Sequence, residues 1–261
     1  TQLLKYYFFA LKSPQYTLLS ESLSEKMLNL MFLIAVMLLS ASVYALSWAY
    51  VASLVVSSVV GMLIFNSKIK GALRRESRHK LDFKSVISFS LPLMLNGILG
   101  VILAWTDTVF IGIFKSDADV GVYNAAYVIS SALMIFWLSF GNIFYPIISE
   151  LYARKAVTLI RKIFEIASRW IFILAFPVFI IVLLFPARLL SLVFGQSYVH
   201  ASLPLLVLII GYFFTTIFGL SEQGLITFKK TNFLGIITSV ALAVNIILNV
   251  ILIPIYGITG A

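Results

Sequence analysis

One carboxylate lies inside an apolar stretch that is long enough to cross a membrane. In residues 88–114 the only charged side chain is that of Asp107. An acid in hydrocarbon costs about 2.5–3.5 kcal/mol on insertion scales, and such acids usually face a cavity or a bundle interior, where they bind ions, relay protons or pair with cations. We therefore take Asp107 as a candidate for ion or proton coupling. The alternative is a structural hydrogen bond to a neighbouring helix, or an acid at the interface.

Two amides form a second candidate site. Asn245 and Asn249 are four residues apart in the apolar stretch 233–253, so they share one face of a helix. Their carbonyl oxygens can bind a cation, and their amides can equally join two helices at about 0.6 kcal/mol per hydrogen bond. Both interpretations stay open at this stage.

Other polar side chains near the ends of apolar stretches are candidates for contact with a substrate: Tyr123, Asn124, Tyr127, Glu222, Gln223 and Arg188. Tyr123, Asn124 and Tyr127 share about one helix face, and polar aromatics suit sugar rings, which combine apolar faces with hydroxyls. The same residues also fit the aromatic belt of a membrane interface. Arg188 can meet a phosphate, or its side chain can snorkel to the surface.

The composition indicates which elements must position these residues. The chain of 261 residues is 61% hydrophobic and 11% charged, whereas soluble domains have about 45–50% apolar and about 25% charged residues. Stretches of about 20 apolar residues cross a bilayer as helices, and no alternating pattern of barrel strands occurs. The sequence predicts an all-α polytopic membrane protein with about seven spans: 26–43, 46–65, 88–114, 121–148, 170–186, 203–226 and 233–253.

Several classes of function find no support in the sequence. The chain has no Cys and two His, which lie in different loops, and it has none of the common nucleotide-binding or hydrolase motifs. The net charge of +9 fits the cytoplasmic loops of a membrane protein better than a nucleic-acid partner. We expect no enzyme activity, no metal and no cofactor, apart from Na⁺ or H⁺ as a coupling ion.

The positions of the cations test the order of the spans. If successive spans alternate in direction, all Lys and Arg except Lys115 and Arg188 fall on one side. This asymmetry predicts that loops 67–84, 149–169 and 227–232 are cytoplasmic, in a multi-pass protein of the cytoplasmic membrane.

The basic stretch 67–84 separates two groups of spans. We predict that residues 1–66 form the end of an N-terminal lobe, 67–84 a cytoplasmic linker, and 85–261 a truncated C-terminal lobe with about five spans. The stretches "YALSWA" (44–49) and "YGITGA" (256–261) agree by residue class, which suggests a parallel repeat of transporter halves. We expect the sequence to be an internal fragment of a longer protein.

A family resemblance supports this organisation. Residues 83–155 contain Leu91-Pro92 opening a helix, Asp107 before an apolar end, a short acidic turn and "VGVYNAA", and Pro146 before a basic loop. This order resembles the seventh and eighth helices of polysaccharide transporters (O-antigen flippases) of the multidrug/oligosaccharidyl-lipid/polysaccharide (MOP) exporter superfamily. The stretch 225–261 is similar to the eleventh helix of that family and the approach to its twelfth.

The resemblance implies two lobes of six helices that flip polyprenyl-linked oligosaccharides by alternating access, often with Na⁺ or H⁺. In the lipid II flippase branch a cation site uses an acid on the seventh helix and Asn and Asp on the eleventh, which match Asp107, Asn245 and Asn249. Asn249 departs from the acid of that pattern.

The expected partners are the bilayer, the lipid-linked glycan, and a glycan polymerase or glycosyltransferases. Two alternatives stay open, a cation-coupled multidrug antiporter and a non-transporting scaffold of a glycan assembly complex.

Overall fold

The computed structural model describes residues 83–261 continuously and, before them, positions 27, 30, 31, 34, 48, 50–56, 58 and 59. The chain divides into two compact units, Thr1–Lys80 and Leu81–Ala261. Most of the predicted spans 26–43 and 46–65, and residues 67–82 of the predicted linker, lie outside the described residues. All candidate site residues belong to the second unit, which is described below.

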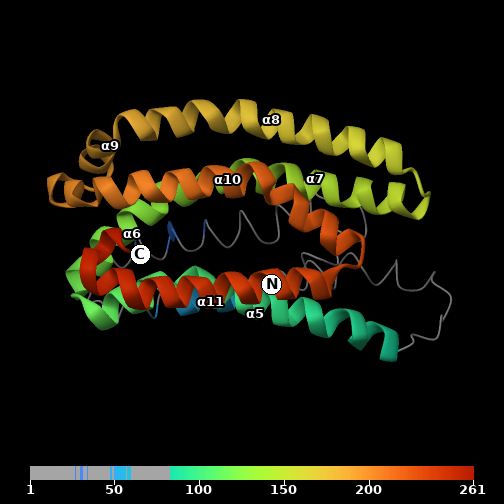
Figure 1. Ribbon diagram of the computed structural model, residues 1–261, viewed down its shortest axis with the longest axis horizontal. Helices are drawn as coiled ribbons and strands as arrows, with labels where there is room; N and C mark the ends of the chain where they lie inside the picture. Colours follow the sequence, from blue (N-terminus) through green and yellow to red (C-terminus); the bar gives the residue numbers. More distant parts are fainter. Residues whose placement is uncertain are drawn as a thin grey trace. The chain divides into compact units, whose positions relative to one another are not determined.

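The second unit is built from helices (Figure 1). They are α5 (Phe83–Phe114), α6 (Asp117–Ser131), α7 (Met134–Ala153), α8 (Val157–Leu184), α9 (Pro186–Val193), α10 (Ser202–Thr227) and α11 (Thr231–Tyr256), with 3₁₀ turns η2 (Gln196–Ala201) and η3 (Gly257–Thr259). Five stretches are long and apolar enough to cross a membrane: Ser90–Phe114, Met134–Ala153, Val157–Leu184, Gln196–Thr227 and Thr231–Thr259. The predicted all-α polytopic membrane fold is confirmed.

The predicted span 121–148 consists of two helices. Between α6 and α7, Ala132 and Leu133 keep right-handed helical φ and ψ, but the backbone N–H of Leu133 bonds to Ser130 O, three residues back, at 3.2 Å. The hydroxyls of Ser130 and Ser131 accompany this tightening by donating to the carbonyls of Ala126 and Val128. Serine in a helix competes for carbonyls in this way and often bends it, so the chain continues in one direction through a short 3₁₀ step.

The loop predicted at 149–169 is much shorter in the structure. Helix α7 continues to Ala153 and α8 begins at Val157, so the connection is three residues long. Charged side chains in 161–169 lower the hydropathy there, and the apolar stretch is uninterrupted only from residue 170. The helix nevertheless forms because Ile160, Ala167 and Ile171 recur at helical spacing and are buried.

The helices alternate in direction, as the distribution of cations predicts. The turn between α7 and α8 and the turn between α10 and α11 lie at the same end of the unit (Figure 1), where the rings of Tyr152 and Phe228 are 5.2 Å apart. The cations of these two turns are Arg154, Lys155, Lys229 and Lys230. Lys115 follows the C-terminal end of α5 and Arg188 that of α8, and both helices end on the opposite side of the unit (Figure 1). That the basic end is cytoplasmic stays a prediction.

The helices pack in two groups. Helix α10 lies against α6, α7 and α8 and buries a continuous stripe of its surface there, whereas α11 packs mainly against α5 (Figure 1). Close contact in the first group depends on glycine. A Cβ at Gly219 of α10 would lie 2.7 Å from the ring of Trp137 in α7, and one at Gly224 would lie 2.8 Å from the ring of Phe164 in α8. Small residues let membrane helices approach closely.

We therefore expect Gly219→Ala to lower the stability of the unit by about 1–3 kcal/mol, because the new methyl group overlaps the indole of Trp137. Gly211→Ala on the same helix is the matched control, since no atom lies within 4 Å of the added Cβ. Thermal unfolding of the full-length protein in detergent measures both. Equal melting temperatures for the two variants would contradict this description of the packing.

Candidate coupling site at Asp107

The carboxylate of Asp107 in α5 accepts hydrogen bonds from three side chains on two other helices. Asn245 Nδ2 and Asn249 Nδ2 of α11 donate to its Oδ1 at 2.9 and 2.7 Å, and the hydroxyl of Tyr123 in α6 donates to its Oδ2 at 3.0 Å. Asn249 Nδ2 also lies 3.2 Å from Asn245 Oδ1. Asn249 and Tyr123 are each 1% exposed. We call these four residues the Asp107 cluster.

The pairing of α5 with α11 brings the acid and the two amides together. The helices run parallel, because the separation in sequence between bonded residues is nearly constant along them: 135 for Asn96 with Thr231, and 138 for Asp107 with Asn245. Asn96 Nδ2 donates to Thr231 O and to Pro92 O, each at 2.9 Å. Asn96 is 11 residues before Asp107, so at about 1.5 Å per residue the two polar contacts are roughly 16 Å apart along α5.

Helix α6 positions Tyr123, and a capping box fixes the start of this helix. Ser116 Oγ accepts from the backbone N–H of Asp119, and the Asp119 carboxylate accepts from the backbone N–H of Ser116 at 3.1 Å. The Ser116 hydroxyl also donates to that carboxylate at 2.7 Å, and these hydrogen bonds lower the pKa of Asp119. Two turns of α6 then separate the cap from Tyr123, which enters the interface of α5 and α11.

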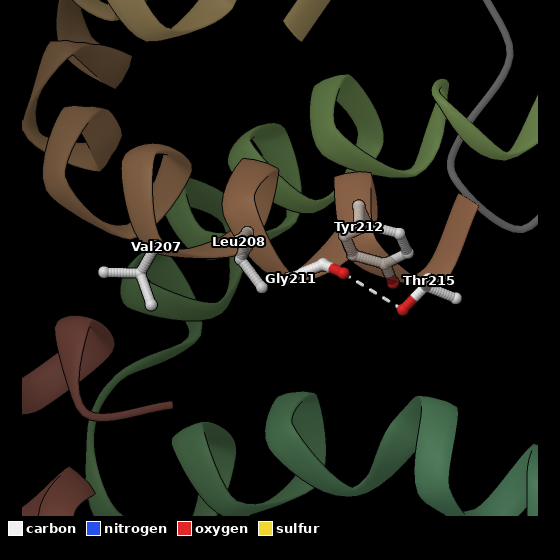
Figure 2. A pocket seen from close by; sticks show the side chains of 5 residues that line it. All are labelled: Val207, Leu208, Gly211, Tyr212 and Thr215. Carbon is white, nitrogen blue, oxygen red and sulfur yellow. Dashed lines mark hydrogen bonds between the residues drawn. The ribbon is translucent and has the colours of Figure 1, made fainter. Parts of the chain in front are cut away.

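A groove runs along the opposite face of α10 from its buried stripe. It has a volume of about 260 Å³ and is lined by Val207, Leu208, Gly211, Tyr212 and Thr215. Figure 2 shows these residues on successive turns of α10, with Thr215 Oγ1 donating to Gly211 O at 3.0 Å. The groove is connected with α6 through Tyr212, whose ring meets that of Tyr127 edge to face, with centroids 6.0 Å apart.

The structure separates the remaining predicted residues from the Asp107 cluster. Glu222 is exposed and lies seven residues after Thr215 on α10, so it shares the face of the groove. Gln223 faces α7, where its Cγ lies 4.0 Å from a Cβ built on Gly141. Arg188 lies over the ring of Phe185 at 5.6 Å. Asn124 is half-buried and makes no side-chain hydrogen bond within residues 83–261.

Sequence reasoning missed three residues of this region. Nothing in the pattern of α10 distinguished Tyr212 from the many aromatic residues around it. Asn96 carried a signal, an amide four residues after a proline inside an apolar helix, which can bond to the proline's carbonyl. Thr231 takes part through its backbone carbonyl, which no side-chain pattern reveals. Tyr123 was a candidate for contact with a substrate, and in the structure its hydroxyl donates a hydrogen bond to Asp107.

The composition of the Asp107 cluster limits what it can bind. It offers one carboxylate, two amides and one phenol, and the described residues contain no group of three or more His, Cys, Asp or Glu that could hold a metal. Oxygen ligands with a single negative charge suit a monovalent hard cation or a proton better than a divalent or transition metal. An amide rotated by 180° presents its oxygen in place of its nitrogen, so Asn245 and Asn249 can change from donors to ligands.

We expect Asp107 and Asn249 to be coupled in stability. In a double-mutant cycle of Asp107→Ala with Asn249→Ala, the coupling free energy should be about 0.6–1.7 kcal/mol, because each single change removes the same hydrogen bond. The matched control pairs Asp107→Ala with Asn124→Ala and should give a value near zero. Thermal or denaturant unfolding in detergent measures the cycle. A zero value for the Asn249 pair would show that this contact contributes nothing to stability.

Comparison with known proteins places the chain in a family. Residues 1–152 match the family described as "Polysaccharide biosynthesis protein", and residues 92–251 match the MatE family. The "Probable low-salt glycan biosynthesis flippase Agl15" of Haloferax volcanii is 26% identical over 217 residues, which are 83% of this chain and 45% of that protein. The "Uncharacterized membrane protein MJ1068" of Methanocaldococcus jannaschii is 24% identical over 222 residues, 82% of this chain and 44% of that protein.

The chain thus spans less than half the length of these two curated relatives. The chain has no significant match among solved structures. Each of the two family matches covers more than half of the chain, and the overlap contains the whole segment from Pro92 to Tyr152. The chain belongs to the polysaccharide biosynthesis protein family, within the MOP exporter superfamily that also includes MatE proteins.

Proposed function

We propose that the full-length protein is a transporter rather than an enzyme, and that it flips lipid-linked glycan precursors across the cytoplasmic membrane by alternating access. Family membership supports a role in polysaccharide biosynthesis, and the relative in Haloferax volcanii carries the name of a glycan biosynthesis flippase. The proposed substrate is a polyprenyl-linked oligosaccharide. A glycan polymerase or glycosyltransferases are the proposed protein partners.

One observation carries the coupling part of the proposal, the convergence of α5, α6 and α11 on the carboxylate of Asp107. Among the described residues, the hydrogen-bond donors that stabilise the carboxylate in the absence of a cation or proton come from α6 and α11. When Na⁺ or H⁺ neutralises Asp107, these donors lose their acceptor or rotate, so the contacts between the three helices change. An ion can bias the opening of a lobe only if it binds the open and closed conformations with different affinity. Such a difference is expected here, because binding of the ion changes the hydrogen bonds between the three helices.

A second candidate function is a cation-coupled drug antiporter, which the MatE match over residues 92–251 favours. It would use the same acid but another substrate. The third alternative, a non-transporting scaffold of a glycan assembly complex, predicts that Asp107 has no effect on transport. One experiment separates the three.

The experiment uses the full-length protein in liposomes with a fluorescent dolichyl-linked oligosaccharide, and follows flipping by accessibility to a membrane-impermeant quencher. Flipping should depend on a gradient of Na⁺ or H⁺. Asp107→Asn should lower the ion-dependent rate by about tenfold, because a typical coupling free energy of 1–3 kcal/mol corresponds to roughly 5–150-fold.

Asn142→Ala is the control, since Asn142 is exposed on α7 and makes no side-chain hydrogen bond within residues 83–261, and its rate should equal that of the wild type. Flipping no faster than in empty liposomes would exclude the flippase function. Export of cationic drugs by the same liposomes would then favour the antiporter, and no transport of either substrate would favour the scaffold. Full ion-dependent activity of Asp107→Asn would leave Asp107 with only a structural role.

A further inference from the structure

Three tyrosines extend from the groove on α10 to the carboxylate of Asp107. Tyr212 lines the groove, its ring meets Tyr127 edge to face, and Tyr127 is four residues from Tyr123 on the same face of α6. The Tyr123 hydroxyl donates to Asp107 Oδ2 at 3.0 Å.

The burial of the three residues changes along this row. Tyr212 and Tyr127 are half-buried, whereas Tyr123 is 1% exposed. The row therefore begins at a surface that a substrate can reach and ends at a carboxylate that is enclosed by Asn245 and Asn249. A group that contacts Tyr212 is thus linked to Asp107 through packed side chains, without touching the acid itself.

The use of tyrosine at these positions is not explained by packing alone. Next to Tyr212, the contact of α10 with α8 is made by phenylalanines: Phe213 stacks on Phe179 with ring centroids 4.2 Å apart, and Phe172 and Phe176 complete the group. Phenylalanine would fill the space of a buried ring as well, and a buried hydroxyl is costly unless it is bonded. The Tyr123 hydroxyl donates to Asp107, and Tyr212 lines the groove.

We propose that Tyr123, Tyr127 and Tyr212 couple the occupancy of the α10 groove to the cation affinity of Asp107. This proposal rests on the proposed flippase function and names the residues that connect its two ligands. The occupant is one sugar ring of the lipid-linked glycan. A groove of about 260 Å³ is smaller than the usual 300–1,000 Å³ of ligand sites. Its apolar wall with two hydroxyls, those of Tyr212 and Thr215, matches the faces and hydroxyls of a single pyranose.

A tyrosine hydroxyl can donate only one hydrogen bond, and the proposed coupling depends on this limit. A sugar hydroxyl that bonds to Tyr212 shifts the edge-to-face contact with Tyr127, and the shift reaches Tyr123 on the next turn of α6. Because the Tyr123 O–H donates to the charged form of Asp107, any weakening of this bond changes the affinity of the carboxylate for Na⁺ or H⁺. Linkage is reciprocal, so the cation must change the affinity for the sugar by the same factor.

The test measures ion binding at equilibrium on the full-length protein in detergent. The probe is a dolichyl-phosphate-linked hexose, and dolichyl phosphate without sugar is the reference ligand. Two readouts cover both ions, bound ²²Na⁺ and the protons released or taken up in weakly buffered solution. For the wild type we expect the hexose-linked lipid, relative to the reference, to change cation affinity by about fivefold or more.

Tyr212→Phe should reduce this effect of the hexose to less than about twofold. Tyr127→Phe and Tyr123→Phe should also weaken the effect, and Tyr123→Phe should change the cation affinity itself. Tyr198→Phe is the matched control, a half-buried tyrosine that packs against Phe194, and it should behave as the wild type.

An undiminished effect of the hexose in Tyr212→Phe would overturn the proposed coupling and leave the flippase function intact. A hexose effect that is lost equally in Tyr198→Phe would also overturn it, because the row would then have no special role. A wild-type protein that flips no glycan in liposomes and binds neither ion would overturn the proposed function itself, so the two failures are distinguishable.

Discussion

The hydrogen bonds to the carboxylate of Asp107 are the contact on which the arrangement of this unit depends. A charge in the apolar stretch of α5 is tolerated because donors reach it from α6 and α11. The consecutive helices α5 and α6 must therefore meet α11, which is more than 100 residues away in sequence, at one point. The parallel register of α5 and α11 is fixed at the other end by Asn96 and Thr231, and the capping box at Ser116 sets where α6 begins.

The two groups of helices have different kinds of contact. Around α10, aromatic rings fill notches at Gly219 and Gly224, so this group packs as a dense block. The α5–α11 pair is joined by polar contacts at two levels, Asn96 with the backbone of Thr231, and Asp107 with Asn245 and Asn249. Discrete changes between packed elements are the usual basis of conformational switching. A densely packed group beside a pair of helices joined by polar contacts is an arrangement that suits the proposed alternating access.

Much of the fold was predictable, because membrane spans follow from hydropathy and length. The candidates Asp107, Asn245 and Asn249 stood out as polar residues in apolar helices, and the structure brings them together. The start of α8 and the break between α6 and α7 could not be predicted from hydropathy and length. In α8, charged residues masked a helix whose buried face is apolar, and between α6 and α7 the serine hydroxyls act without changing hydropathy. Tyr212 was missed because its importance depends on which residue it meets, and composition carries no such information.

The central claim is that Asp107 binds the coupling cation, and infrared difference spectroscopy of the full-length protein tests it most directly. Spectra are recorded before and after addition of Na⁺, and across a pH titration, for the wild type and Asp107→Asn. The account predicts a change in a carboxyl band of the wild type on addition of one of these ions, and its loss in Asp107→Asn. The same band change in both proteins would show that the cation binds elsewhere, and would contradict the account.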